Sequence, residues 1–141
     1  MQKLDSLVAP LIDLCRLAGE AICGHYHSSS AGEYEAKDDQ SPLTKADILS
    51  HSILVQGLDS LAGDIPILSE ESDNIDVAAR LSWQRYWLVD PLDGTKEFLA
   101  RTGEFTINIA LIDDHSPVLG LLYVPLTQQA YVGIPDVLAR A

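Results

Sequence analysis

The chain has little positive charge and no long apolar run. Nine Lys and Arg residues stand against 21 Asp and Glu, giving a formal net charge of −12 over 141 residues. A surface of this sign repels the phosphates of nucleic-acid polymers, so we expect no such partner. No apolar run approaches the length of a transmembrane helix, and no apolar stretch with a cleavage site opens the chain. We therefore expect neither a membrane span nor a secretion signal.

Cysteine is equally scarce. Cys15 and Cys23 form no CxxC motif and no disulfide framework, and the four histidines have no zinc-binding spacing. This pattern predicts reduced thiols in a cytoplasmic protein. The apolar spacing of residues 4–18 predicts an amphipathic helix, with Pro10 kinking it or marking its start. Such a face is typical of a core helix, and peripheral contact with the inner membrane stays an open alternative.

The chain has a group of acidic residues that directly follows a predicted short strand. Residues 86–89 are aromatic and β-branched, which predicts a buried strand with Asp90 at its carboxyl end. Pro91 fixes the backbone so that Asp93 returns to the same side. Two carboxylates and the carbonyl of Leu92 then form a partial oxygen shell suited to Mg²⁺.

The next two residues suit a phosphate group. Gly94 lacks a side chain where a phosphate oxygen must come close, and the N–H groups of Gly94 and Thr95 open a short helical turn. An Asp-Gly pair is also one of the commonest turn signals, and taken alone it favours an ordinary turn, with Asp90 in a strand-ending Asx turn, over a metal site.

A second strand brings more acids. Residues 65–68 are apolar and precede Glu70 and Glu71. If the two strands are neighbours, Glu70 can reach a cation held by Asp90. Crowded carboxylates are costly unless a metal neutralises them.

Asp47 has two explanations. It follows Thr44 by three residues at the start of an apolar pattern that ends at Gly63, close to a capping box. Capping the helix explains Asp47, and a catalytic role is an equally open alternative on the residues alone.

The rest of the chain predicts strands. Residues 106–112 and 118–124 form an antiparallel hairpin with a loop of more than two residues at 113–117, and residues 129–133 form another strand. We predict an α+β protein, with two N-terminal helices on one face of a largely antiparallel sheet and the metal-phosphate site at its edge.

Three segments together, residues 69–72, 90–98 and 103–110, resemble the inositol-monophosphatase superfamily of metal-dependent, lithium-sensitive phosphatases. Within it, residues 84–89 and 96–98 resemble the bacterial 3′(2′),5′-bisphosphate nucleotidases. The resemblance implies that residues 1–141 are the N-terminal metal- and phosphate-binding domain of the sugar-phosphatase fold, with the C-terminal domain absent. Surface meant for that domain is then exposed, so we expect association, for example as a homo-oligomer.

The resemblance also assigns roles to the residues. It implies that the carboxylates of Glu70, Asp90 and Asp93 and the carbonyl of Leu92 bind Mg²⁺. Full-length members of the family bind two or three such ions and are inhibited by Li⁺. Asp93, Gly94 and Thr95 hold the substrate phosphate.

The implied mechanism is in-line attack of water on a phosphate monoester. Glu70 helps to position the water, and Thr95, polarised by Asp47, accepts its proton.

The substrate implied by the resemblance is adenosine 3′,5′-bisphosphate (PAP), which would lose its 3′-phosphate to give AMP, with the sulfate-donor nucleotide PAPS as a second substrate in sulfur metabolism. An inositol-phosphate or sugar-phosphate monoesterase is the alternative within the same class. A truncated, non-catalytic remnant or association module is the alternative of another class.

Overall fold

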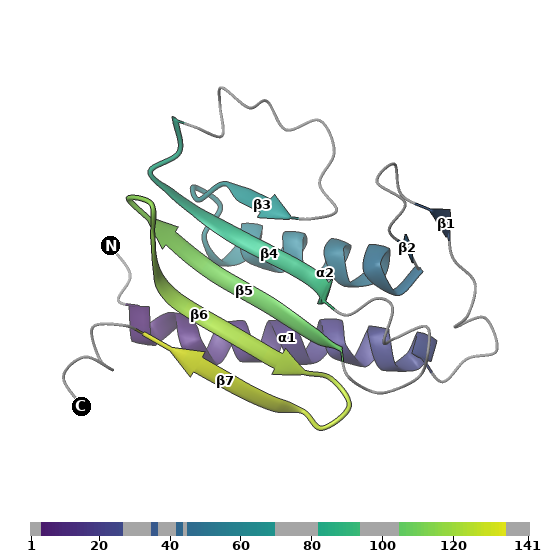
Figure 1. Ribbon diagram of the computed structural model, residues 1–141. Coiled ribbons are helices and arrows are strands. Elements are labelled where there is room, and N and C mark those ends of the chain that lie inside the picture. The colour runs from purple at the N-terminus through teal and green to yellow at the C-terminus, as the bar shows by residue number, and fades with distance from the viewer. Residues whose placement is uncertain are drawn as a thin grey trace.

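Two helices cover one face of a five-stranded sheet in the computed structural model of the protein (Figure 1). The structure describes residues 4–26, 35–36, 42–43, 45–69, 82–93 and 105–134. A separate two-stranded ribbon pairs β1 with β2. The elements are α1 (Leu4–Tyr26), β1 (Glu35–Ala36), β2 (Pro42–Leu43), α2 (Lys45–Leu61), β3 (Ile67–Ser69), β4 (Arg85–Asp93), β5 (Thr106–Asp113), β6 (Ser116–Val124) and β7 (Gln129–Gly133).

The two helices confirm the expected N-terminal pair. Helix α1 continues through Pro10 from Leu4, so the alternative that Pro10 marks its start is wrong. Helix α2 ends at Leu61, two residues before the predicted stop at Gly63. Neither helix of the described ranges is both long enough and apolar enough to cross a membrane.

The sheet has the order β3-β4-β5-β6-β7, and only the first pair is parallel. The predicted α+β class with a largely antiparallel sheet is therefore confirmed. Figure 1 shows α1 and α2 together behind this sheet.

The core lies between the sheet and the helices. Alternate residues of the central strands point toward the helices, as the two-residue period of a strand requires. Their fully buried members include Trp87, Ile107, Leu111 and Leu119, and the matching helix residues include Leu11, Ile22, Leu54 and Leu58. Burying such side chains stabilises the fold by about 1.5–3 kcal/mol each.

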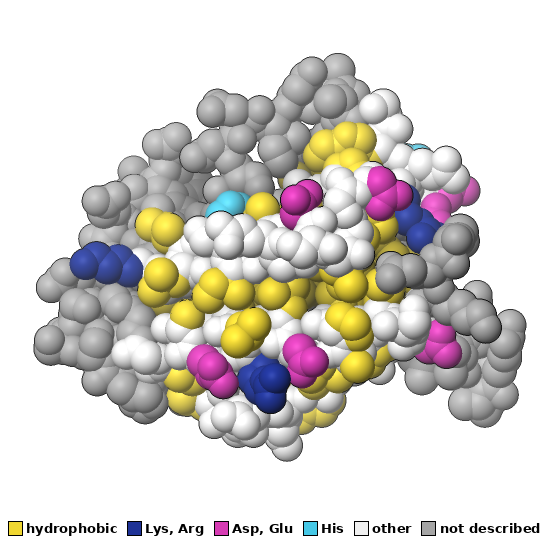
Figure 2. Space-filling model, turned by 180° about the vertical axis from the view of Figure 1, so that it is seen from behind, with side chains coloured by type: hydrophobic (Ala, Val, Ile, Leu, Met, Phe, Trp, Pro, Cys, Tyr) yellow, Lys and Arg dark blue, Asp and Glu magenta, His cyan; other side chains and the backbone are white. Residues whose placement is uncertain are grey.

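Not all apolar helix positions enter the core. Ile48 and Leu49, which contribute to the predicted apolar pattern of α2, are 51% and 45% exposed. Seen from the helical side, hydrophobic side chains gather along the seam between the helices (Figure 2).

The β5–β6 hairpin is tighter than its sequence suggests. Asp113 pairs with Ser116, so only Asp114 and His115 form the loop, and the predicted longer loop is wrong. Both loop residues have positive φ, 51° and 67°, which is the conformation of a type I′ turn. The extra residue lies in the strand instead, where the register shifts between Leu111 and Ile112.

Candidate metal and phosphate site

The acidic segment of β4 is part of the strand. The prediction that Asp90 ends this strand is wrong, because β4 continues to Asp93, which pairs with Thr106 of β5. The register is irregular between Asp90 and Asp93. A bulge of this kind turns side chains away from the strict alternation of the strand. Proline contributes to it, since Pro91 has no N–H for the ladder.

The neighbouring strand meets β4 where the sequence requires it. Strand β3 pairs with β4 in parallel, with Ser69 opposite Val89. The next residues in the sequence are Glu70 and Asp90. The condition that the two acid-bearing strands be neighbours is thus confirmed, and Glu70 itself lies outside the described residues.

Local hydrogen bonds hold the two carboxylates of β4. Oδ1 of Asp90 accepts a 3.3 Å hydrogen bond from the N–H of Leu92, as in an Asx turn. Oδ2 of Asp93 accepts a 3.4 Å hydrogen bond from the side-chain amide of Asn108 on β5. Asp93 is exposed and Leu92 is buried. Hydrogen bonding of these acids to their neighbours is what an outer shell around a metal ligand provides.

The donor set fits Mg²⁺ in kind. Asp90, Asp93 and the carbonyl of Leu92 offer only oxygen atoms, which hard divalent cations prefer. Across the described ranges no group of three His, Cys, Asp or Glu residues is assembled for a metal. Glu70, Gly94 and Thr95, which would complete the predicted site, lie outside those ranges.

Asp47 belongs to the first turn of α2 and is only 1% exposed. The residue has a hydrogen bond or another electrostatic interaction within the chain. Burial of a charge requires compensating partners. The burial is compatible with both explanations given above.

Two further residues of α2 touch the acid-bearing strands, and the sequence reading did not single them out. The hydroxyl of Ser50 donates a 2.7 Å hydrogen bond to the carbonyl of Pro91. Nδ1 of His51 shares a 2.9 Å hydrogen bond with Oγ of Ser69. Their signal in the sequence is the spacing from Asp47, since residues three and four apart share one helix face.

A largely apolar hollow adjoins Asp90. This cavity of about 460 Å³ is lined by both polar and apolar residues of three adjacent strands: Leu68, Ser69, Leu88, Val89, Asp90, Asn108 and Ala110. Leu88 is 43% exposed there. The carboxylate of Asp90 therefore stands at the border of an apolar surface.

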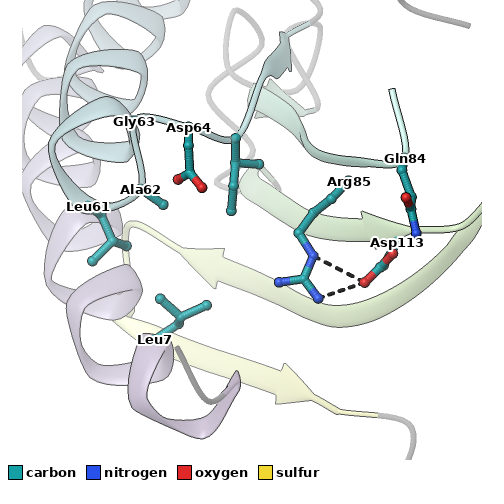
Figure 3. A pocket seen from close by; sticks show the side chains of 9 residues that line it. Leu7, Leu61, Ala62, Gly63, Asp64, Gln84, Arg85 and Asp113 are labelled. Atoms are coloured by element: carbon teal, nitrogen blue, oxygen red, sulfur yellow. Dashed lines mark hydrogen bonds and ion pairs between the residues drawn. The ribbon is translucent and has the colours of Figure 1, made fainter. Parts of the chain in front are cut away.

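A larger cavity of about 820 Å³ lies at the other end of β4 (Figure 3). Leu7 and Leu61 form apolar walls, and Arg85 pairs with Asp113 through bonds of 3.1 and 2.6 Å to one carboxylate oxygen. Its single cation is thus already engaged with an acid, and none of the predicted site residues lines it. Size alone does not make it the site of phosphate chemistry.

Known proteins match this chain over most of its length. The model of the inositol monophosphatase family matches residues 3–136. The chain belongs to the inositol monophosphatase family. The 3′(2′),5′-bisphosphate nucleotidase CysQ of Salmonella typhimurium is 50% identical over 125 residues, which are 89% of this chain and 50% of that protein.

Solved structures of the family share the fold. CysQ from Bacteroides thetaiotaomicron superposes with a TM-score of 0.78 at 42% identity, covering 93% of this chain and 46% of that one. A staphylococcal inositol monophosphatase-1, solved as a LiCl-soaked inhibitory complex, gives a TM-score of 0.81 at 18% identity, covering 95% and 49%. The chain spans about half the length of the curated relatives it matches.

Proposed function

We propose that the chain forms the metal- and phosphate-binding half of an Mg²⁺-dependent phosphatase that removes the 3′-phosphate of adenosine 3′,5′-bisphosphate to give AMP. The observation that carries the proposal is the parallel pairing of Ser69 with Val89, because Glu70 and Asp90 follow them in the sequence. The names of the CysQ relatives support the bisphosphate nucleotide as substrate class.

The proposal assigns residues 1–141 to the N-terminal domain of the family fold. A second half, as long as the part of the relatives that the chain does not match, would complete the site and select the nucleotide. PAPS is proposed as a second substrate. Small phosphorylated nucleotides, rather than nucleic-acid polymers, fit a chain with a net charge of −12, since a cation can offset that charge locally.

The carboxylates of Asp90, Asp93 and Glu70 and the carbonyl of Leu92 would hold Mg²⁺. Bound there, Mg²⁺ would neutralise phosphate charge and lower the pKa of the attacking water. The all-oxygen donors on β4 are the structural support for this choice of metal.

The chain's own residues do the remaining work in this proposal. Gly94 and Thr95 bind phosphate through their N–H groups, and Glu70 orients the attacking water. The Thr95 hydroxyl would take the proton of that water as it passes its own proton to the carboxylate of Asp47. A carboxylate that is 1% exposed is suited to this task because it has little contact with bulk water.

Phosphate release from adenosine 3′,5′-bisphosphate by the purified chain tests the proposal. Release that requires Mg²⁺, falls with Li⁺ and disappears in Asp90→Asn supports a working half-site. Faster release from inositol 1-phosphate or a sugar phosphate would support the alternative monoesterase. No release from a folded chain, above that of a Glu70→Gln control, would favour the non-catalytic remnant or association module.

Location and assembly are proposed from the cysteines and from the exposed apolar residues. Two free cysteines, one of them buried, favour the reducing cytoplasm. Exposed apolar residues on the outer sheet face, such as Leu88 and Leu122, favour a homo-oligomer. Light scattering over a range of concentrations checks the second proposal: a mass of one chain throughout would contradict it.

A further inference from the structure

Helix α2 is hydrogen-bonded to both acid-bearing strands through two consecutive residues. His51 shares a 2.9 Å hydrogen bond with Ser69 on β3, and Ser50 donates a 2.7 Å hydrogen bond to Pro91 on β4. Ser69 directly precedes Glu70, and Pro91 directly follows Asp90. Two consecutive helix residues thus bind the sequence neighbours of two candidate metal ligands.

Burial strengthens these two hydrogen bonds. Ser69 is 3% exposed and Ser50 is fully buried, so water competes poorly for their hydroxyls. A buried hydroxyl that loses its partner costs more than a surface one. Each bond therefore fixes where its strand lies relative to α2.

Strand β3 depends on this contact more than β4 does. It has only three residues and pairs with a single neighbour, whereas β4 has nine residues and is flanked by β3 and β5. The side chain of His51 anchors the last residue of that short strand. Without it, Ser69 would lose this side-chain link between β3 and α2.

We propose that His51 is a positioning residue: through Ser69 it holds the end of β3 against β4 next to Asp90, and it thereby raises the affinity of the proposed site for a divalent cation. The inference rests on the metal site of the proposed function. It adds a residue on α2 whose contact is with the strand and not with the metal.

The test compares metal affinity among variants of the chain. His51→Leu replaces the imidazole with an apolar side chain of similar bulk and removes the hydrogen bond, whereas His51→Asn keeps a polar atom near the position of Nδ1. We measure Mn²⁺ and Mg²⁺ binding by calorimetry and Mn²⁺ binding also by electron paramagnetic resonance. Thermal unfolding of the metal-free variants separates loss of affinity from loss of fold.

The expected result is a loss of metal affinity of about tenfold in His51→Leu, as is typical for partners of metal ligands, with His51→Asn within about threefold of the unchanged chain. Ser69→Ala should produce a similar loss, and the double variant should lose little more than either single one. Gln56→Leu, an exposed change on the same helix, is the control for the added apolar side chain.

The outcomes separate this inference from the function on which it rests. The positioning role alone is overturned if His51→Leu and Ser69→Ala leave metal binding unchanged while Asp90→Asn abolishes it. Absence of binding in the unchanged chain overturns the metal site and the positioning role together. If His51→Leu fails to fold, the other two variants still test the positioning role. Ser69→Ala must then lose about tenfold in metal affinity, and His51→Asn must stay within about threefold of the unchanged chain.

Discussion

The side-chain amide of Asn108 bridges two residues at the irregular end of the β4–β5 pair. It donates a 3.4 Å hydrogen bond to Oδ2 of Asp93 and a 3.1 Å hydrogen bond to Oγ1 of Thr106. In the ladder, Asn108 lies opposite Asp90. A neutral donor thus stands beside two carboxylates, orienting one of them without adding charge.

Asp93→Asn should weaken Mg²⁺ and Mn²⁺ binding at least tenfold because it removes a charged oxygen ligand. Asp93 is exposed, so the melting temperature should change by only about 2 °C or less. Calorimetric titration and thermal unfolding measure the two effects. Asp114→Asn, an exposed change in the β5–β6 turn, is the matched control. Equal affinities for the two variants would remove Asp93 from the site.

Much of the fold was predictable because its signals are local. Alternation and apolar content predicted the strand at residues 86–89 and the two hairpin strands. The structure places these strands in one sheet. The bulge between Asp90 and Asp93 was not predictable in the same way, since it depends on pairing with β5. The same holds for the tight turn at Asp114 and His115.

The site was predictable in part. Asp90 and Asp93 stand out because the acids cluster in sequence next to a strand. The bonds from Ser50 to Pro91 and from His51 to Ser69 join residues 41 and 18 positions apart. No local pattern specifies such contacts, because they depend on how α2 packs against the sheet. Ile48 and Leu49 show the same limit: their spacing fits a core face that the packing leaves exposed.

His115→Gly should stabilise the protein by about 1 kcal/mol, because glycine adopts a φ of 67° without the steric cost that other residues pay. Urea unfolding measures the change. Ser116→Gly, one position later at the start of β6, should instead destabilise by about 0.5–1 kcal/mol through chain entropy. Destabilisation of similar size by both changes would mean that the turn does not have this conformation.

Gly57→Ala should destabilise the contact between α1 and α2. A Cβ at Gly57 would overlap Cδ1 of Leu14 and lie 2.8 Å from its Cδ2, and Leu14 is only 9% exposed. Overpacking costs about 1–3 kcal/mol, which exceeds the gain of about 1 kcal/mol that alanine brings to a helix.

Gly24→Ala is the matched control, since a Cβ there has no neighbour within 4 Å. It lies near the end of α1 and should stabilise the helix by up to about 1 kcal/mol. Chemical unfolding of both variants gives the comparison. A stabilising Gly57→Ala would show that the helices do not approach this closely.

Cys15 should resist alkylation in the folded protein. Burial raises the pKa of its thiol from 9.0 to about 12, so about one thiol in a thousand is ionised at pH 9. Cys23 is less buried, and burial also raises its pKa, so it should react first. Timed iodoacetamide labelling with mass spectrometry separates the two sites. Equal rates in the folded state would contradict the burial of Cys15.

The same raised pKa makes stability fall at high pH. The unfolded chain releases the Cys15 proton near pH 9, whereas the folded chain keeps it up to about pH 12, so the unfolded state binds fewer protons in between. The contribution is complete below pH 9 and is lost as the pH rises toward 12, with a limiting slope of about 1.4 kcal/mol per pH unit. Cys15→Ala should flatten this part of the curve in urea unfolding between pH 8 and 11, although it also lowers stability at every pH by leaving a small cavity. A slope unchanged by Cys15→Ala would assign the loss to other groups.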